Sequence, residues 1–520
     1  MATETLPTVI QPRQPKGAFA NEPFTDFKQH ENARRMKAAL EVVAAELGRE
    51  YDLVIGGHRF RTKGKIRSVN PSRPDQVVGI HQKAEAEHAP QAMQAALEAY
   101  AHWSRTSVET RASLLLHAAE IIRERKFEFC AWLTYEVGKN WAEADADVGE
   151  TIDFLEYYAR EALRLAQAKP SIQYPGERNE LHYIPLGVGA VIPPWNFPFA
   201  IMAGMTAAAI VAGNTVVLKP SSDSPTIAAR FVNVLEEAGM PGGVVNFCPG
   251  SGATFGNAIV EHPKTRFIAF TGSKAVGLEI HERAAKTQPG QIWIKRTILE
   301  MGGKDSILVC ADADLDAAVE GVVASAFGFS GQKCSACSRA IIEAPLYDVF
   351  VERLRERVAK LTVGEAIDNP NMGPVVNKAA HESMLRYIEI GKKEGRLVAG
   401  GHSVQTEAGG FLMEPTVFAD VSPQAVLAVI KVKDFEEGLA VVNNTEYGLT
   451  GAIYTADREK LDRARHEFHV GNLYFNRKCT GAMVGAHPFG GFNMSGTDSK
   501  AGGPDYLLLF TQAKSVAERL

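Results

Sequence analysis

Two cysteines three residues apart lie in the segment Gly331-Gln-Lys-Cys334-Ser-Ala-Cys337-Ser338. A pair like this can bind zinc, form a redox couple or supply one nucleophile. A structural zinc site needs four ligands, and no second CxxC or HxxxH pattern lies nearby. Three alternatives remain open: a redox pair, a buried unreactive cysteine, and a nucleophile at Cys334. The cation of Lys333 would favour the thiolate of Cys334.

Two further residues could assist a nucleophile. Glu300 precedes Met-Gly-Gly, and the glycine pair would permit a turn that directs the carboxylate into a cleft. A solvated loop glutamate is the ordinary alternative. Asn196 stands between Trp195 and Phe197 in a proline-bracketed turn. A rigidly held amide there suits an oxyanion hole, and it equally suits a turn that bonds its own backbone.

Two short segments could hold a phosphate group. Gly250-Ser-Gly252-Ala-Thr-Phe-Gly256 follows a strand-like run and precedes a helix, but it is one residue too long for the dinucleotide fingerprint GxGxxG. A tight turn that needs glycine is the alternative. Phe270-Thr-Gly-Ser273 also joins a strand-like run to a helix. Backbone N–H groups could meet a diphosphate there, or the serine could cap the helix.

The elements that must position these residues follow an alternating α/β pattern. Apolar residues at three- and four-residue spacing predict helices at 32–48, 83–102, 108–137, 143–168, 199–213, 225–238, 314–328, 345–361, 379–394 and 434–443. Ser224 is predicted to cap the helix that begins at Pro225. Short apolar runs predict strands at 188–192, 215–218, 244–247, 267–270, 307–310, 340–343, 426–432 and 472–475. The spacing therefore predicts two α/β units with parallel sheets, after a mostly helical lead-in and with two polar β segments near 171–186 and 505–518.

Composition excludes several classes of partner. The 520 residues are 45% hydrophobic and 22% charged, which is typical of a globular chain of two to four domains. The net charge is -5 without a long run of one sign, which argues against nucleic acid and anionic membranes. Six cysteines are too few for a disulfide framework, no secretory signal is visible, and the longest apolar stretch, 199–213, is shorter than the ~20 residues of a membrane span. A soluble, cytoplasmic protein is expected.

The order of the motifs is more specific than any one of them. The segments are Pro194-Trp-Asn-Phe-Pro198, Lys219-Pro-Ser-Ser222, Phe270-Thr-Gly-Ser273, Glu300-Met-Gly-Gly303, Gly331-Gln-Lys-Cys334 and Pro488-Phe-Gly-Gly491. Along nearly its whole length the chain resembles the aldehyde dehydrogenase superfamily. Further segments resemble the 1-pyrroline-5-carboxylate (L-glutamate γ-semialdehyde) dehydrogenase branch: Phe19-Ala-Asn-Glu-Pro23, Tyr135-Glu-Val-Gly-Lys-Asn-Trp141, Cys334-Ser-Ala-Cys-Ser338 and 472–485.

The resemblance implies a mechanism and a set of site residues. Cys334 would attack the aldehyde, Asn196 would hold the oxyanion, and Glu300 would activate the water that releases glutamate, the second step of proline degradation. The implied cofactor is NAD, with NADP also possible, held by Trp195, Lys219, Ser222, Gly252, Gly256 and Ser273. The implied substrate contacts are Ser338, Gly481, Ala482 and Phe489, and no metal is expected.

The resemblance also implies the architecture. The fold class is α/β and aldehyde dehydrogenase-like, with a Rossmann-like cofactor domain at 1–170 and 187–299 and a catalytic domain at 300–496. A small β-flap at 171–186 and 497–520 would serve oligomerisation, so a homo-oligomer built from dimers is expected. The partners would be a small-molecule substrate and copies of the chain, with no nucleic acid and no membrane.

Two departures from the family pattern affect these expectations. Ser222 stands where many NAD-preferring relatives carry Glu, so NADP would meet no repelling carboxylate there. Between Ala425 and Val426 about ten family residues are missing, including a Glu-x-Phe-Gly-Pro motif whose glutamate normally holds the nicotinamide ribose. Two alternatives therefore stay open: another semialdehyde dehydrogenase, for example one for succinate semialdehyde, and a catalytically impaired homologue.

Overall fold

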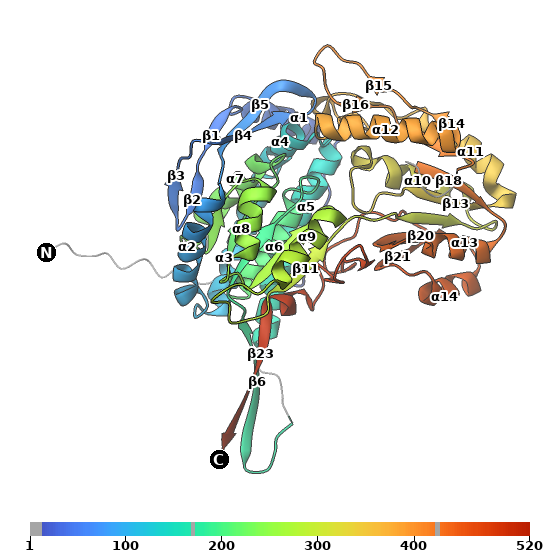
Figure 1. Ribbon diagram of the computed structural model, residues 1–520. Coiled ribbons are helices and arrows are strands. Elements are labelled where there is room, and N and C mark those ends of the chain that lie inside the picture. Colours follow the sequence, from blue (N-terminus) through green and yellow to red (C-terminus); the bar gives the residue numbers. More distant parts are fainter. Residues whose placement is uncertain (1–12, 168–171, 422–426) are drawn as a thin grey trace.

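The computed structural model describes residues 13–167, 172–421 and 427–520 (Figure 1). Its first sheet has seven strands in the order β11-β10-β7-β8-β9-β2-β3. The five strands from β11 to β9 are parallel, whereas β2 and β3 are antiparallel. Their bounds are β2 Leu53–Ile55, β3 His58–Phe60, β7 Val188–Ile192, β8 Thr215–Leu218, β9 Val245–Phe247, β10 Phe267–Thr271 and β11 Arg296–Glu300.

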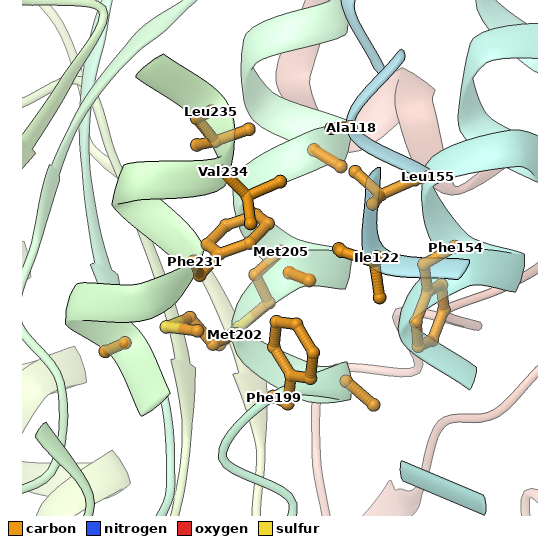
Figure 2. Packing of buried hydrophobic residues seen from close by; sticks show 14 of the residues in the cluster. Ala118, Ile122, Phe154, Leu155, Phe199, Met202, Met205, Phe231, Val234 and Leu235 are labelled. Atoms are coloured by element: carbon orange, nitrogen blue, oxygen red, sulfur yellow. The ribbon is translucent and has the colours of Figure 1, made fainter. Parts of the chain in front are cut away.

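The helices of this part of the chain pack on the sheet or on one another. They are α1 His30–Ala44, α2 Ala89–Trp103, α3 Val108–Glu124, α4 Lys126–Val137, α5 Trp141–Ala166, α6 Ala200–Val211, α7 Pro225–Glu237, α8 Asn257–Glu261 and α9 Lys274–Ala285. Figure 2 shows Ile122, Leu155, Met202 and Phe231 from four of these helices meeting in one apolar cluster. Helix α6 approaches α5 closely because Gly204 has no side chain: a Cβ there would lie 3.0 Å from the Phe154 ring. The buried apolar stretch 199–213 is thus a core helix.

The N-terminal part contains more β structure than predicted. Strands β1 Arg49–Tyr51, β4 Lys65–Asn70 and β5 Arg73–Gln82 form a separate sheet, and β2 and β3 join the first sheet. The prediction of a mostly helical lead-in was therefore wrong between residues 49 and 82. A hairpin signal was present, because Gly56 and Gly57, both with positive φ, make the two-residue turn that joins β2 to β3.

The start of α7 also differs from the prediction. The Ser224 side chain makes no capping hydrogen bond to α7. The Glu136 carboxylate on α4 instead accepts the N–H groups of Thr226 at 2.6 Å and Ile227 at 2.8 Å. A buried carboxylate at a helix N-terminus satisfies the unpaired N–H groups of the first turn more strongly than a hydroxyl. The partner comes from 90 residues earlier in the chain, so local sequence could not reveal it.

The second sheet also has seven strands, in the order β14-β17-β18-β13-β12-β20-β21, all parallel except β14. The strands are β12 Ser306–Val309, β13 Arg339–Glu343, β14 Arg396–Ala399, β17 Val417–Ala419, β18 Leu427–Val432, β20 Thr450–Tyr454 and β21 Asn472–Phe475. The helices are α10 Leu315–Phe327, α11 Ala344–Val358, α12 Lys378–Glu394, α13 Phe435–Asn443 and α14 Arg458–Glu467.

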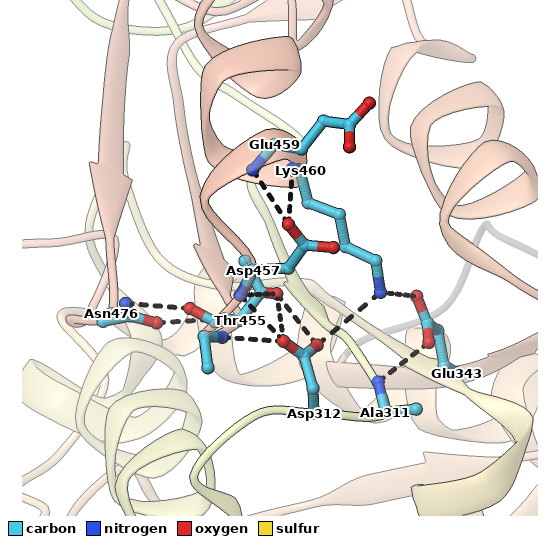
Figure 3. Close-up of polar contacts among 9 residues, drawn as sticks. Ala311, Asp312, Glu343, Thr455, Asp457, Glu459, Lys460 and Asn476 are labelled. Atoms are coloured by element: carbon cyan, nitrogen blue, oxygen red, sulfur yellow. Dashed lines mark hydrogen bonds and ion pairs between the residues drawn. The ribbon is translucent and has the colours of Figure 1, made fainter.

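A polar network joins the carboxyl ends of the second sheet's central strands (Figure 3). Asp312, after β12, accepts the Thr455 hydroxyl at 2.8 Å and the N–H of Asp457 at 2.8 Å. Lys460 lies 3.6 Å from Asp312 and 3.4 Å from Glu343. The acids and the cation at this edge therefore pair with one another.

Two connections matter for function. Strands β6 Glu177–Pro185 and β23 Thr511–Arg519 form an antiparallel arm that projects from the body (Figure 1). The parallel neighbours β17 and β18 are joined by residues 420–426 alone, whereas a parallel crossover generally takes a dozen or more residues. The junction Ala425–Val426, where the family pattern predicts missing residues, lies outside the described residues.

Candidate active site

The carboxyl ends of five parallel strands carry most of the predicted site residues. Strand β7 leads into Trp195 and Asn196, β8 into Lys219 and Ser222, β9 into the glycine segment 250–256, β10 into Ser273, and β11 ends at Glu300. The order of the strands reverses between β7 and β10, since β8 and β9 follow on one side and β10 and β11 on the other. Open α/β sheets bind ligands at the carboxyl edge beside such a reversal.

Lys219 lies buried at this edge. Its ammonium donates to the carbonyls of Pro220 at 3.1 Å and Gly250 at 3.3 Å, and burial lowers its pKa to about 8. No carboxylate pairs with it among the described residues. Such a buried cation, bonded only to neutral carbonyls, suits a polar ligand that brings further acceptors. Ser222 and Gly252 beside it are exposed, and a Cβ on Gly252 would meet nothing within 4 Å, so the edge is open.

The two phosphate candidates have different local structures. Residues Gly252–Gly256 form a π-helical turn that leads into the five-residue α8. Ser273 caps α9, since its hydroxyl accepts the Val276 N–H at 3.4 Å. The Ser273 side chain thus caps the helix, as one of the two alternatives expected. Ser273 is also exposed and lies on the open edge of the sheet.

The loop that carries Cys334 has an unusual backbone. Phe329, Ser330 and Gly331 are consecutive residues with positive φ of 51°, 56° and 75°. Left-handed backbone costs an ordinary residue roughly 1–2 kcal/mol, so neighbouring contacts must maintain it. The Ser330 hydroxyl donates to the Gly373 carbonyl at 2.8 Å, and the Gln332 side chain accepts the Val376 N–H at 2.9 Å. These contacts fix the loop directly before the cysteine.

A cavity of about 550 Å³ joins the two key residues. Cys334 and Glu300 both line it, together with Gly481, Ala482 and Phe489, three of the four predicted substrate contacts. The fourth, Ser338, lies elsewhere: its hydroxyl donates to the Asp305 carbonyl at 3.3 Å, and it lines a separate cavity of about 150 Å³. Ser335, directly after Cys334, stands in the wall of the larger cavity.

The environment of Cys334 does not favour a thiolate in the way the sequence suggested. Burial, with the negative charges of Asp305 and Glu300, raises the pKa of the thiol to about 12. Lys333 was expected to oppose this, but its ammonium pairs with Glu143 at 2.7 Å. The partner lies 190 residues away in sequence. That expectation was therefore wrong, because Glu143 neutralises the cation.

Glu300 is held at the edge of the cavity by donors. Its carboxylate accepts the Ser499 hydroxyl and the Gly491 N–H, the latter at 3.1 Å. Burial raises its pKa to about 7, although these hydrogen bonds oppose the shift. A carboxyl group that titrates near neutral pH is suited to general base catalysis.

Asn196 lies next to the cysteine loop. Its side-chain amide donates to the Gln332 carbonyl at 3.1 Å, and its oxygen accepts the Phe197 N–H at 3.1 Å. An amide nitrogen carries two N–H donors, so one remains for a ligand. The structure thus shows Asn196 bonding its own turn and the loop of Cys334, and its role in an oxyanion hole stays a prediction.

Cys337 points away from Cys334. It is buried, its thiol donates to the Arg339 carbonyl at 3.6 Å, and it lines the smaller cavity. A redox pair needs the two sulfurs within bonding reach of each other, and these two face different cavities. The nucleophile hypothesis for Cys334 fits this arrangement better than the redox hypothesis.

Several cavity residues were not predicted. Besides Ser335, the wall contains Arg477 and Lys478, and Arg477 donates to the Gly481 carbonyl at 3.0 Å. Glu150 also lines the cavity, and burial with the nearby Asp147 raises its pKa to about 8. A signal was available for Arg477, which follows strand β21 in the segment Asn472–Lys478.

Among residues 13–167, 172–421 and 427–520, no group of three or more His, Cys, Asp or Glu side chains is placed to hold a metal ion. In the same ranges, every helix is too short or too polar to span a bilayer.

Comparisons with known proteins match nearly the whole chain. A model of the aldehyde dehydrogenase family matches residues 59–516. The 1-pyrroline-5-carboxylate dehydrogenase of Geobacillus thermodenitrificans is 58% identical over 511 residues, covering 96% of this chain and 99% of that protein. A solved 1-pyrroline-5-carboxylate dehydrogenase from Thermus with bound NAD superposes with a TM-score of 0.96 at 51% identity, covering 98% of this chain and 100% of that one. Proline utilization A from Bdellovibrio bacteriovorus superposes at 0.95 with 46% identity, covering 98% of this chain and 54% of that one.

Proposed function

The chain belongs to the aldehyde dehydrogenase family, and we propose that it oxidises L-glutamate γ-semialdehyde, formed from 1-pyrroline-5-carboxylate, to L-glutamate with NAD. The observation that carries this function is the single cavity lined by Cys334, Glu300 and the segment Gly481-Ala482. The reaction is the second step of proline degradation. The similarity to named dehydrogenases of this substrate over nearly their full length supports it.

Acylation begins at Cys334. Its thiolate adds to the aldehyde carbon and gives a thiohemiacetal, whose oxyanion is held by the remaining Asn196 N–H and the Cys334 backbone N–H. Because burial raises the pKa of the resting thiol to about 12, the thiol proton would pass to a water molecule as the sulfur attacks the aldehyde. NAD, when bound, supplies the hydride acceptor. Collapse of the thiohemiacetal leaves a thioester on Cys334.

Deacylation uses Glu300. Its carboxylate removes a proton from a water molecule, the resulting hydroxide attacks the thioester, and the Cys334 thiolate leaves as L-glutamate forms. The raised pKa of about 7 makes the carboxylate a strong enough base for this step at neutral pH. Ser499 and Gly491 keep it in place during the reaction.

The cofactor edge of the first sheet fits NAD. Lys219 would contact the adenosine ribose, while Gly252, Gly256 and Ser273 would lie beside the diphosphate and Trp195 nearer the nicotinamide. Ser222 is exposed and carries no charge, so a 2′-phosphate would meet no repulsion from it. NADP is therefore proposed as a second acceptor.

The substrate would be held at the end of the cavity beyond the aldehyde. The Gly481-Ala482 backbone would bind the α-carboxylate and amine, and Phe489 would pack on the aliphatic chain. Ser335, as a cavity residue, replaces Ser338 as the proposed hydroxyl contact to the carboxylate. Arg477 would keep the 481–482 segment in position through its bond to the Gly481 carbonyl.

A catalytically impaired homologue is the second candidate. The short connection between β17 and β18, seven residues from 420 to 426, favours it, because the family's nicotinamide ribose contact lies in the missing segment. The cavity that joins Cys334 and Glu300 argues against complete loss of activity. We therefore propose an active enzyme in which hydride transfer is slow.

The remaining proposals concern assembly and location. The projecting arm of β6 and β23 is proposed as the oligomerisation element of a homo-oligomer built from dimers. The domain division at 1–170 and 187–299, 300–496, and 171–186 and 497–520 is proposed to correspond to the two sheets and the arm. A cytoplasmic location is also proposed, by similarity to the 1-pyrroline-5-carboxylate dehydrogenases above.

Relative rates on two semialdehydes test the substrate. Succinate semialdehyde keeps a carboxylate but lacks the α-amine and is one carbon shorter, so it would lose the amine contact proposed at Gly481 and Ala482. We expect a kcat/KM for glutamate γ-semialdehyde at least about tenfold above that for succinate semialdehyde, which corresponds to one charge-assisted hydrogen bond. An equal or reversed ratio would assign the chain to another semialdehyde.

A further inference from the structure

The N-terminal segment 19–25 crosses the outer end of the substrate cavity. Glu22, Phe24 and Thr25 line this cavity, although they precede Cys334 by some 310 residues. Phe24 is 63% exposed, so it lies at the opening. We name residues 19–25 the strap.

Two buried acids of α5 anchor the strap. Asp153 accepts the Glu22 N–H at 2.7 Å, and Asp145 accepts the Thr25 N–H at 2.8 Å as well as the Thr25 hydroxyl. Both acids are less than 5% exposed and both line the cavity. A buried carboxylate without donors is costly, so these bonds hold the strap across the opening.

A lysine adds a third anchor. The Lys126 ammonium lies 3.0 Å from Asp145 and donates to the Pro23 carbonyl at 2.9 Å. Gly149 on α5 faces the strap, and a Cβ there would contact Glu22 at 3.8 Å. The strap is therefore seated on α5 by both polar and van der Waals contacts.

Asn21 connects the strap to the opposite wall. Its single amide group donates to the Asp153 carboxylate at 2.8 Å and to the Val484 carbonyl at 3.0 Å. Val484 belongs to the same loop as Gly481 and Ala482. Phe19 packs on Tyr157, with ring centroids 5.1 Å apart, and fixes the strap on the α5 side. One side chain thus spans the opening from α5 to the proposed substrate loop.

We propose that the strap closes the outer end of the cavity and that Asn21 is a positioning residue that selects short, polar aldehydes. An aldehyde with its carbonyl at Cys334 extends toward the loop 481–484, and the strap limits how long it can be. By holding Val484, Asn21 also keeps the substrate loop in its binding position. The proposal rests on the proposed function for its substrate, and on the contacts above for its geometry.

Asn21→Ala tests the proposal through substrate choice. With glutamate γ-semialdehyde we expect kcat/KM to fall about tenfold, mainly through a higher KM, whereas kcat/KM with octanal stays constant or rises. Thr25→Val removes the hydroxyl anchor with little change of shape and should act in the same direction. Asn32→Ala is the matched control, because its amide also donates to a backbone carbonyl, that of Asp26, but away from the cavity. An equal fall for both aldehydes, or no change, would overturn the proposal.

Alkylation of Cys334 tests the strap without requiring dehydrogenase activity. Cys334 is half-buried in the cavity, whereas the other five cysteines are buried. Asn21→Ala should accelerate its reaction with a bulky maleimide about tenfold and its reaction with iodoacetamide far less, and Cys334→Ala should remove the label. Unchanged rates of maleimide labelling would contradict the proposal that the strap closes the cavity. If the rates change but the wild type does not oxidise glutamate γ-semialdehyde, the proposed function fails and the strap stands.

Discussion

Replacing Glu300 by Gln separates the two halves of the proposed reaction. Acylation needs Cys334 and the oxyanion donors, whereas hydrolysis of the thioester needs a base. Glu300→Gln should therefore give a burst of one NADH per active site and then a steady state slowed about 10²–10⁴-fold. Rapid-mixing absorbance measurements of NADH separate the two phases. Loss of the burst would mean that Glu300 acts before hydride transfer and would refute the assigned role.

The same substitution should change stability with a predictable sign. The pKa of Glu300 rises from 4.5 to about 7 on folding, and each unit corresponds to about 1.36 kcal/mol, so the folded carboxylate costs up to about 3 kcal/mol. The folded state binds the Glu300 proton more tightly than the unfolded state. The protonated carboxyl therefore contributes its full stability below pH 4.5, and this contribution is lost as the pH rises to about 7. Gln keeps two of the three contacts, since the Ser499 hydroxyl can accept an N–H and Gly491 still donates to the oxygen, whereas the Ser499 backbone N–H loses its acceptor.

The substitution Glu300→Gln changes the free energy of unfolding by a different amount at each pH. We expect this change to be more favourable at pH 8 than at pH 5 by about 2 kcal/mol. Urea unfolding of both proteins at the two pH values measures this difference. Ser499→Ala is the matched control: it removes a donor to the carboxylate, so the pKa of Glu300 rises further. The ascending limb of the pH profile for thioester hydrolysis, followed as glutamate release from the acylated enzyme, then moves above pH 7. If the ascending limb of this pH profile does not move, Glu300 does not control the rate of thioester hydrolysis.

Three further predictions concern the cavity and the short connection. Cys334→Ala should abolish NADH formation while Cys337→Ala leaves most of it, and equal loss would favour a redox pair. Ser335→Ala should raise KM for glutamate γ-semialdehyde about ten- to a hundredfold and KM for propanal much less, whereas Ser338→Ala should change neither strongly. Inserting a ten-residue segment with Glu-Ile-Phe-Gly-Pro between Ala425 and Val426 should raise kcat more than it improves the cofactor Kd, because hydride transfer needs closer geometry than binding. Wild-type turnover already equal to that of full-length relatives would refute this last prediction.

The parallel strands were predictable because their signal is local. Strands β7 and β8 occupy residues 188–192 and 215–218 as predicted, since short buried apolar runs bounded by Gly and Pro leave little choice of element. Their carboxyl ends then bring Asn196 and Lys219 to one edge of the sheet. The strand order alone thus brings motifs that are distant in sequence to the carboxyl edge of the first sheet.

The residues that the sequence misassigned depend on distant partners. Lys333 is neutralised by Glu143, and α7 is capped by Glu136, both from more than 80 residues away. Ser335 and Ser338 are three residues apart in one loop, yet Ser335 lines the larger cavity and Ser338 the smaller one. Such choices are made by tertiary packing and have no counterpart in local spacing.

The most direct test of the whole account is NADH formation by the unmodified protein with 1-pyrroline-5-carboxylate and NAD. We expect NADH and L-glutamate in equal amounts, with neither formed by the Cys334→Ala variant. Absence of NADH at cofactor and substrate concentrations that saturate binding, or turnover that persists in Cys334→Ala, would contradict it.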